Sequence, residues 1–261
     1  MAIRVMTLNT WFGTRFEELI SFLAESADEI DVFCFQEVYH CIEGHCPHPR
    51  GARDNLFQEM ERVLPRHQGF FFPVLTDMEK PYAYLPISFG TATFVRRNLP
   101  IRSCRSEIIH GDPAKFVPGE PLTVPRNLSC VTIQCDGLNI LSVCNMHGLW
   151  NGYGKTDTVD RLRQARTAKL FLGQVPGRKV LCGDFNLRPD TRSFAILADG
   201  MRDLVSECGN TNTRSHTHYS KEERFADYIL ADSLGMEIEH FQVVQAHGVS
   251  DHLPLVVTVL L

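Results

Sequence analysis

Polar side chains stand at the ends of apolar segments of this sequence, and the clearest case is the pair Asp184 and Asn186. The pair follows a short apolar run, residues 179–183, and precedes a turn at residues 187–189. The apolar run predicts a buried strand. Residues two apart in an extended chain point to the same side, so a carboxylate and an amide project together from the end of this strand. Taken alone, the segment is equally typical of an ordinary strand that ends in a polar turn.

The same pattern recurs along the chain, and that recurrence favours a common site. Polar residues end or follow predicted strands at eight positions: Asn9, Glu37, His147, Asp184, Asn186, Asp227, Asp251 and His252. Carboxylates with amides nearby suit magnesium or manganese. Histidines beside them suit acid, base or charge-stabilising work on a phosphate. Each residue alone has a plainer interpretation, such as a hydrogen-bonded core histidine at His147, but repeated burial of polar groups is costly unless they meet each other or a metal.

The elements that would position these residues are strands alternating with helices. Apolar runs and alternation predict strands at 3–8, 31–35, 88–95, 128–134, 138–143, 179–183, 225–230, 241–245 and 253–261. Apolar residues at helical spacing predict helices near 16–23, 56–64, 159–172 and 193–198. Strand signals in both halves, with helices between them, predict one α/β domain over residues 1–261 with mostly antiparallel sheets.

Three local features sharpen this pattern. Asp136-Gly137 lies between two of the predicted strands and is the strongest hairpin signal in the chain. The spacing of Thr14 and Glu17 is that of a capping box at the start of the first helix. In the helix at 159–172, Val159, Leu162, Ala165 and Leu172 would form the apolar stripe, and the charges Arg161, Arg163, Arg166 and Lys169 are expected on the solvated face.

Composition excludes several classes of protein. The 261 residues are 44% hydrophobic, which allows a sizeable core, and the formal net charge is −5 with no basic run. This charge argues against a protein that coats long nucleic acid, although not against an enzyme that binds a few phosphates through a metal ion. The nine cysteines are scattered, several within apolar runs. With a polar amino terminus and no apolar run of membrane-spanning length, we expect a soluble, cytoplasmic protein without stable membrane insertion or an evident obligate protein partner.

The loop at 40–54 contains a cluster of metal-binding residue types, Cys41, His45, Cys46 and His48. A structural zinc site is one interpretation. The spacing is irregular and has no matching second half in the chain, so we favour a polar loop on the substrate side.

Six segments together resemble the ordered signature of the endonuclease/exonuclease/phosphatase superfamily. They are Thr7-Leu8-Asn9, Phe35-Gln36-Glu37-Val38, Asn145-Met146-His147, Gly183-Asp184-Phe185-Asn186, Asp227-Tyr228-Ile229 and Ser250-Asp251-His252. That group contains pancreatic-type deoxyribonucleases, AP endonucleases, tyrosyl-DNA phosphodiesterases, neutral sphingomyelinases and inositol polyphosphate 5-phosphatases. The resemblance implies a four-layer α/β/β/α sandwich, with two mainly antiparallel sheets packed face to face and outer helices. It also implies a phosphoesterase that depends on Mg²⁺ or Mn²⁺.

The resemblance implies a role for each acidic or amide residue of the signature. Glu37 would be the main metal ligand, helped by Asn9 and Asp251. Asp184 would orient or deprotonate the attacking water, and Asn186 would hold a phosphate oxygen.

The histidines would act on the phosphoryl group. By resemblance, His252 would contact it, with Asp227 orienting the ring, and this pairing is expected to raise the pKa of His252. His147 would assist the leaving group or bind phosphate. In deoxyribonuclease-like members the matching histidine leans on a glutamate of an earlier strand, but residues 88–93 offer none. We therefore expect His147 to bind phosphate rather than to act as a general acid.

The sequence leaves the class of substrate open. Trp11, Trp150 and Tyr153 could stack on a base or sugar, or simply pack at the rim, and Arg126 and Lys155 are candidate phosphate contacts. We expect a phosphodiesterase acting on nucleic acid or its ends. The alternative is a hydrolase of small-molecule or lipid-headgroup phosphates. An inactive binding module of the same fold should lack a ligand, and none of the expected ligands is missing.

Overall fold

The computed structural model describes residues 1–45, 51–80 and 83–261, which form two six-stranded sheets with helices outside them. Across the first sheet the order is β11 (Glu237–Val243), β12 (Leu255–Leu260), β1 (Ala2–Asn9), β2 (Val32–His40), β4 (Ala83–Arg96) and β3 (His67–Lys80). Across the second it is β5 (Ile101–His110), β6 (Arg126–Gln134), β7 (Ile140–His147), β8 (Arg178–Asp184), β10 (Asp227–Asp232) and β9 (Met201–Asp203). The strand pairs β1–β2 and β7–β8 are parallel.

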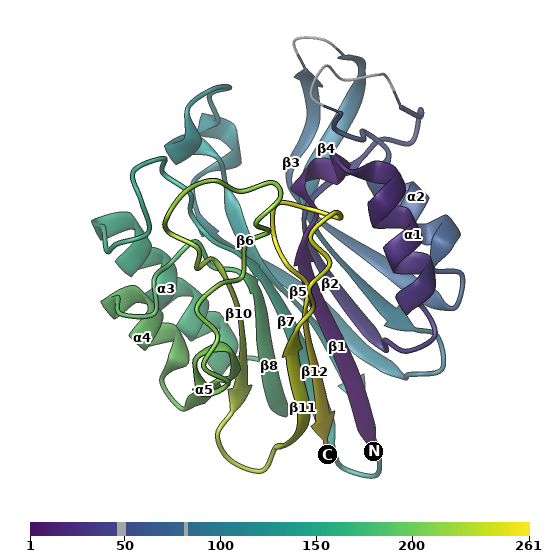
Figure 1. Ribbon diagram of the computed structural model, residues 1–261, viewed down its shortest axis with the longest axis vertical. Helices are drawn as coiled ribbons and strands as arrows, with labels where there is room; N and C mark the ends of the chain where they lie inside the picture. Colours follow the sequence, from purple (N-terminus) through teal and green to yellow (C-terminus); the bar gives the residue numbers. More distant parts are fainter. Residues whose placement is uncertain (46–50, 81–82) are drawn as a thin grey trace.

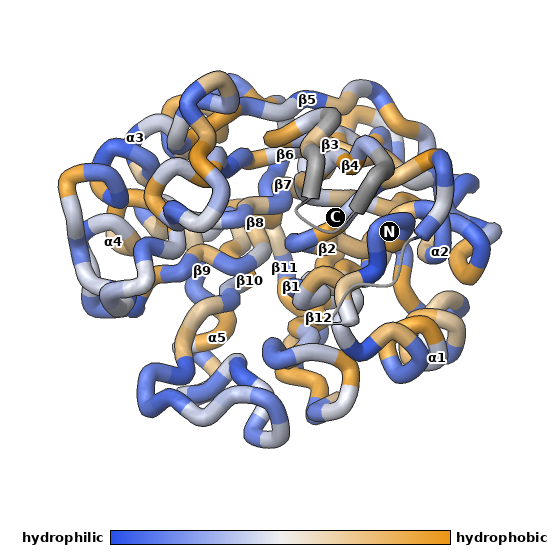
Figure 2. Tube along the Cα trace, turned by 90° about the horizontal axis from the view of Figure 1, so that it is seen from above, coloured by the Kyte–Doolittle hydropathy of each residue, from blue (hydrophilic) through white to orange (hydrophobic). Residues whose placement is uncertain are grey.

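Helices cover the outer face of each sheet. The α-helices are α1 (Phe16–Ser26), α2 (Leu56–Val63), α3 (Val159–Gly173), α4 (Arg192–Ala198) and α5 (Leu204–Glu207), and the 3-10 turns are η1 (Trp11–Gly13), η2 (Pro113–Lys115) and η3 (Pro121–Thr123). Figures 1 and 2 show α1 and α2 on one side of the molecule, α3 and α4 on the other, and the strands between them. The predicted four-layer α/β/β/α sandwich is confirmed.

The side chains of β1 point alternately into two apolar layers. Ile3 and Val5 are fully buried in the core between the sheets, while Met6 and Leu8 are buried in the layer under α1 and α2. Both faces of β1 therefore carry apolar side chains, although Arg4 and Thr7 interrupt the apolar run. Cys34, which is buried between the sheets, is a free core cysteine, as expected.

The structure confirms one local prediction and corrects another. The hairpin at Asp136-Gly137 is present, with Gln134 opposite Ile140. The capping box is wrong, because Arg15 is the N-cap of α1 and the Thr14 hydroxyl instead donates to the carbonyl of Trp11 (2.7 Å). The strand predicted at 88–95 is the second half of the longer strand β4.

Two predictions can be compared only with the residues that the structure describes. Cys46 and His48 of the proposed zinc cluster lie outside them, so that alternative stays a prediction. Of the cluster, His45 accepts a hydrogen bond at Nδ1 from the backbone amide of Asp54 (3.3 Å). Among the described residues, no helix has the length and apolar composition needed to cross a bilayer.

Candidate active site

The predicted site residues converge where the parallel strand pairs end. Asn9 lies at the end of β1, and His147 lies opposite Asp184 at the ends of β7 and β8. Asp227, the first residue of β10, pairs with Asp184 from the other side. Because the two sheets face each other, their polar ends meet, and the Asn9 side-chain amide donates to Asp184 across the gap (3.1 Å).

A second polar bridge between the sheets was not foreseen from the sequence. Gln36 donates to the side chain of Asn145 (2.7 Å), and Asn145 donates to the carbonyls of Phe35 and Ala92 (both 3.1 Å). All these donors and acceptors are buried, so each unmade bond would cost a desolvation penalty. The bridge therefore fixes the spacing of the sheets directly beneath the site.

Backbone strain concentrates at the site. Among the described residues, the non-glycine residues with positive φ are Trp11, Phe12, Glu37 and Asn186, at 49° to 57°. All four line one cleft. Strained backbone of this kind persists only where the surrounding structure imposes it, and it gathers at functional sites.

Two features of the strands produce that geometry. The register of β2 against β4 shifts between Phe35 and Val38, and this bulge aims Glu37 into the cleft. Gly183 has φ of 132°, and a Cβ there would lie 2.0 Å from the carbonyl oxygen of Met146. Glycine is therefore required immediately before Asp184, which explains the Gly-Asp-Phe-Asn motif.

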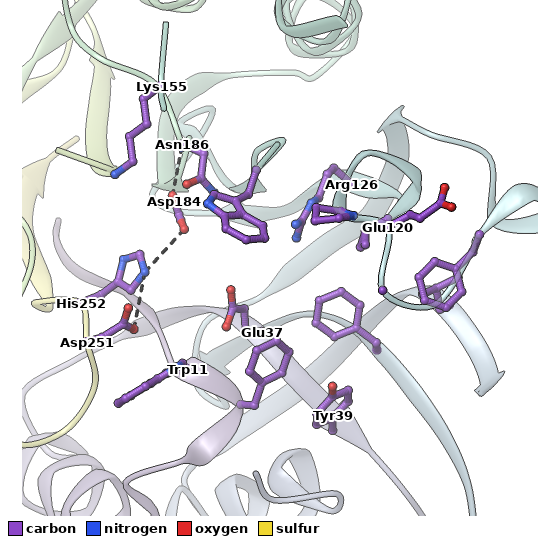
Figure 3. Close-up of a pocket in the computed structure, with 18 of the residues that line it drawn as sticks. Trp11, Glu37, Tyr39, Glu120, Arg126, Lys155, Asp184, Asn186, Asp251 and His252 are labelled. Carbon is purple, nitrogen blue, oxygen red and sulfur yellow. Dashed lines mark hydrogen bonds and ion pairs between the residues drawn. The ribbon is translucent and has the colours of Figure 1, made fainter. Parts of the chain in front are cut away.

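The cleft has a volume of about 650 Å³ and is lined by residues from both halves of the chain. Figure 3 shows the charged and polar residues of its inner end, Lys155, Asp184, Asn186, Asp251 and His252, with Glu37 and Arg126 further along and Tyr39 and Glu120 toward the far end. Asn9, His147 and Asp227 are buried and do not line it.

Glu37 and its acidic neighbours form a set of donors that fits a divalent cation. The Glu37 side chain is 19% exposed. Burial, together with the negative charges of Asp251 and Asp184, raises the pKa of Glu37 to about 7, although the Asn9 side chain opposes the shift. Oxygen ligands that repel one another in this way are what a hard cation such as Mg²⁺ or Mn²⁺ would stabilise, so the residues present fit the predicted ion.

His252 lies between a carboxylate and a guanidinium. Its Nδ1 lies 2.8 Å from both carboxylate oxygens of Asp227, as predicted. Its Nε2, however, contacts the guanidinium of Arg214. Burial and the charge of Arg214 lower the pKa of His252 to about 3, so the predicted rise is wrong. With Nδ1–H donating to Asp227, the neutral ring accepts at Nε2.

His147 lies against the guanidinium of Arg126. Arg126 Nη1 lies 3.0 Å from Nδ1 and 2.9 Å from Nε2 of the ring. Burial and the charge of Arg126 lower the pKa of His147 well below its usual value. Arg126 lines the cleft, and its Nε is buried without a partner among the described residues. Arg126 therefore reaches the cleft directly, whereas His147 lies behind its surface.

The other predicted substrate residues divide into two groups. Trp11, Trp150 and Lys155 line the cleft, whereas Tyr153 does not and is 86% exposed. Lys155 is buried and its ammonium donates to the carbonyl of Phe225. Burial and the charge of Arg214 lower the pKa of Lys155 to about 8.

Sequence reasoning missed the loop at 209–226 as a source of site residues. Arg214, Tyr219 and Lys221 from this loop line the cleft. The segment has neither periodicity nor a motif, and only its position before the strand of Asp227 hints at its role.

Arg161 corrects another prediction, because it is fully buried rather than solvated. Its guanidinium donates to four oxygens of the loop that follows β7: the carbonyls of Leu149, Gly154 and Thr156, and the side chain of Asn151. Arg161 therefore braces the loop that carries Trp150 and Lys155. Val159, expected in the apolar stripe of the same helix, is instead 72% exposed.

Replacing Arg161 with methionine is expected to destabilise the protein by about 3 kcal/mol, because several loop oxygens lose their donors. The unfolding midpoint should fall by roughly 6–12 °C for a chain of this size, as measured by calorimetry. Arg163→Met is the matched control on the same helix, where the side chain is 73% exposed. Equal midpoints for the two variants would contradict the bracing role.

Comparisons with known proteins agree with this fold. The profile of the Endonuclease/Exonuclease/phosphatase family matches residues 6–252. Among solved structures, the endonuclease/exonuclease/phosphatase from Bacteroides vulgatus has a TM-score of 0.71 at 16% identity, with 100% of this chain and 99% of that chain covered. The Bacteroides thetaiotaomicron mannosyl-6-phosphatase also has a TM-score of 0.71 at 16% identity, covering 99% and 100%.

The human Nocturnin catalytic domain with bound sulfate has a TM-score of 0.68 at 18% identity, covering 99% of this chain and 94% of that one. Identities this low show a shared fold and no more. A search of curated proteins by sequence found no match. Because the family profile spans nearly the whole chain and the fold agrees with it, the chain belongs to the endonuclease/exonuclease/phosphatase family.

Proposed function

We propose that this protein hydrolyses phosphodiesters by metal-assisted attack of water on phosphorus, with nucleic acid or its ends as substrate. The observation that carries the proposal is the meeting of Glu37, Asp184 and Asp251 with the His252–Asp227 pair at one end of a single cleft. A carboxylate cluster, a fixed imidazole and strained backbone in one place are typical of hydrolytic sites.

Glu37, Asn9 and Asp251 would hold Mg²⁺ or Mn²⁺. When bound, the ion would withdraw charge from the phosphoryl oxygens. The Asn9 amide donates to Asp184, so its oxygen remains available, although that oxygen also accepts from the backbone of Trp11 (3.0 Å).

Asp184 and Asn186 act on the reacting groups. Asp184 is fixed by two donors, the Asn9 amide (3.1 Å) and the backbone amide of Asn186 (2.9 Å), so its remaining lone pairs can orient the attacking water and accept its proton. Asn186 makes a single long side-chain bond, to Gly148 (3.4 Å), and its Oδ1 has no partner among the described residues. Its amide is therefore free to turn toward a phosphate oxygen.

The cations of the cleft support an anionic substrate. Four basic residues line it, Arg126, Lys155, Arg214 and Lys221, although the whole chain carries a formal charge of −5. The cleft is also lined by four acidic residues, Glu37, Glu120, Asp184 and Asp251, so the cations offer a phosphate local contacts without the general affinity for nucleic acid of a basic protein. Trp11 and Trp150 line the same cleft and could stack on a base.

The far end of the cleft favours a second candidate, a small-molecule or lipid-headgroup phosphodiester. Phe12 stacks on Tyr39 with centroids 5.1 Å apart, and Phe89 lies 5.8 Å from Phe12. Phe116 and Val124 pack into the same apolar cluster. An apolar ester group could be buried there.

A paired substrate set separates these candidates. The set contains bis-p-nitrophenyl phosphate, p-nitrophenyl phosphate, an abasic duplex, a single-stranded oligonucleotide and p-nitrophenyl phosphorylcholine, each with Mg²⁺, Mn²⁺ or EDTA. We expect metal-dependent cleavage of diesters with kcat/KM at least about tenfold above that for the monoester. Preference for phosphorylcholine over oligonucleotides would move the substrate to the second candidate. Preference for the monoester would contradict the proposal, and Asp184→Asn controls for contaminating activity.

We further propose that the protein acts in the cytoplasm without an obligate protein partner, with phosphate esters as its ligands. Eight described cysteines are unpaired, as they would be in a reducing compartment. Recovery of the protein from cells with intramolecular disulfides would contradict this location.

A further inference from the structure

Arg214 occupies a position that the family resemblance does not explain. It is buried, 7% exposed at its side chain, and it lines the cleft. Its Nη1 donates to Asp251 Oδ2 (2.8 Å) and to His252 Nε2. Two residues assigned to metal binding and to phosphoryl contact therefore share one guanidinium.

The loop backbone holds Arg214 in this place. Arg214 forms an isolated β-bridge with His252, because Leu253 N donates to Thr213 O (2.9 Å) and Ser215 N donates to Asp251 O (3.0 Å). The Cα of Arg214 is thus fixed opposite the histidine. The ring of Tyr219, 4.6 Å from the guanidinium carbon, packs against it and provides a cation–π contact.

A second group of possible metal ligands lies beside this guanidinium. Among the described residues, Asp184, Asp227 and His252 offer ligand atoms within 4.8 Å of one another, all of them buried. Their atoms already have partners. Asp227 receives His252 Nδ1, while Asp184 accepts from the Asn9 amide and from the backbone of Asn186. The remaining atom, His252 Nε2, faces Arg214.

We propose that Arg214 is the second cation of a one-metal active site and that it contacts the phosphoryl group directly. The proposal rests on the function proposed above. Asp251 would separate the two positive charges: its Oδ2 accepts from Arg214, and its Oδ1, which accepts a long bond from Ser250 (3.5 Å), would be the oxygen offered to the metal. A phosphoryl group bound between them would meet the metal held by Glu37 and, on the side of His252, the guanidinium of Arg214. Arginine suits this task because its planar guanidinium stays charged and offers several donors to phosphate oxygens.

Metal stoichiometry tests the proposal without a substrate. Mn²⁺ binding is measured by calorimetry and electron paramagnetic resonance on the full chain. We expect one Mn²⁺ per wild-type chain. Arg214→Ala should bind two, since it frees His252 Nε2, the atom that Arg214 withholds from the group of Asp184, Asp227 and His252. Arg224→Ala, an arginine of the same loop that does not line the cleft, should bind one. Two ions in the wild type, or one in both wild type and Arg214→Ala, would overturn the proposal.

Kinetics separates direct phosphoryl contact from a purely structural role. Arg214→Ala should lower kcat roughly 10²- to 10³-fold, the usual effect of removing one charge-stabilising donor. Guanidinium chloride at low millimolar concentration should restore part of the rate, and Arg214→Lys, which keeps the charge, should bind one Mn²⁺ and retain intermediate activity. An Arg214→Ala enzyme within threefold of wild type, or one whose rate guanidinium does not raise, would contradict the contact. A wild type that neither binds Mn²⁺ nor cleaves any diester would instead refute the proposed function itself.

Discussion

Replacing Glu37 with glutamine is expected to abolish metal-dependent hydrolysis and, at the same time, to stabilise the metal-free protein. Glutamine keeps the shape of the side chain but removes the charge that would hold the ion. Loss of a main metal ligand should lower kcat/KM by at least roughly 10³-fold, as loss of the metal removes a stabilisation of several kcal/mol.

The gain in stability follows from the pKa of Glu37. Burial and Asp251 raise it from 4.5 to about 7. A carboxyl with a higher pKa in the folded chain binds more protons when folded, so the metal-free protein loses stability as the pH rises from about 4.5 to about 7. The loss is on the order of 2 kcal/mol for a shift of this size in a partly solvated side chain. The glutamine variant has no such loss.

Thermal unfolding at pH 5 and pH 8, each with EDTA or Mg²⁺, measures both effects. His147 and His252, whose pKa values are lowered by burial, add a pH dependence of opposite sign that both proteins share, so the effect of Glu37 is the difference between the two proteins. With EDTA, the midpoint of the wild type should fall relative to that of Glu37→Gln between pH 5 and pH 8, and Mg²⁺ should raise it again. The midpoint of Glu37→Gln should not respond to Mg²⁺. Glu61→Gln, an exposed glutamate of α2, should behave like the wild type. A Glu37→Gln protein that Mg²⁺ still stabilises would show that the ion binds elsewhere.

Backbone strain at the site adds to the free-energy cost of its crowded negative charges. Glu37 and Asn186 are the two functional side chains with left-handed backbone, at φ of 56° and 51°. Both conformations cost free energy that the surrounding sheets must offset. Acidic crowding adds to that cost until a cation binds. Stability and activity are therefore opposed at these positions, and stabilising substitutions here should impair function.

The place where the candidate site residues meet could be predicted because it depends on short-range signals. Asp184 and Asn186 lie together on the chain, and the glycine before them is required by the close approach of Met146. The parallel ends of β1, β2, β7 and β8 then place those signals at one end of the sandwich. The positive φ of Glu37 was not predictable, because it comes from a bulge that exists only when β2 pairs with β4.

Residues that act through long-range contacts escaped prediction for a physical reason. Arg214 resembles any loop arginine until its backbone pairs with His252, 38 residues away. Arg161 has a helical spacing that favours solvent, yet it satisfies loop carbonyls that no sequence pattern reveals. In both cases the interaction partner is backbone or a distant residue. Periodicity records only which face of an element is apolar, so it assigns such cations to solvent.

Replacing His252 with alanine is expected to lower kcat by roughly 10²- to 10³-fold, because Arg214 loses the acceptor that aligns its guanidinium on the phosphoryl group. Asp227→Asn should have a smaller effect. The ring keeps its place through backbone pairing with Arg214 but loses the carboxylate that fixes its tautomer.

The decisive comparison is the double variant, measured by kcat on the best diester of the substrate set. If Asp227 acts only by orienting His252, the double variant should be no slower than His252→Ala alone, since the orienting group has nothing left to orient. Independent roles would instead multiply the two rate losses. Multiplication would mean that Asp227 acts on the reaction without the histidine. Non-additivity would establish that the buried carboxylate, the imidazole and, through it, the Arg214 guanidinium work as one connected unit, which is the arrangement that their hydrogen bonds describe.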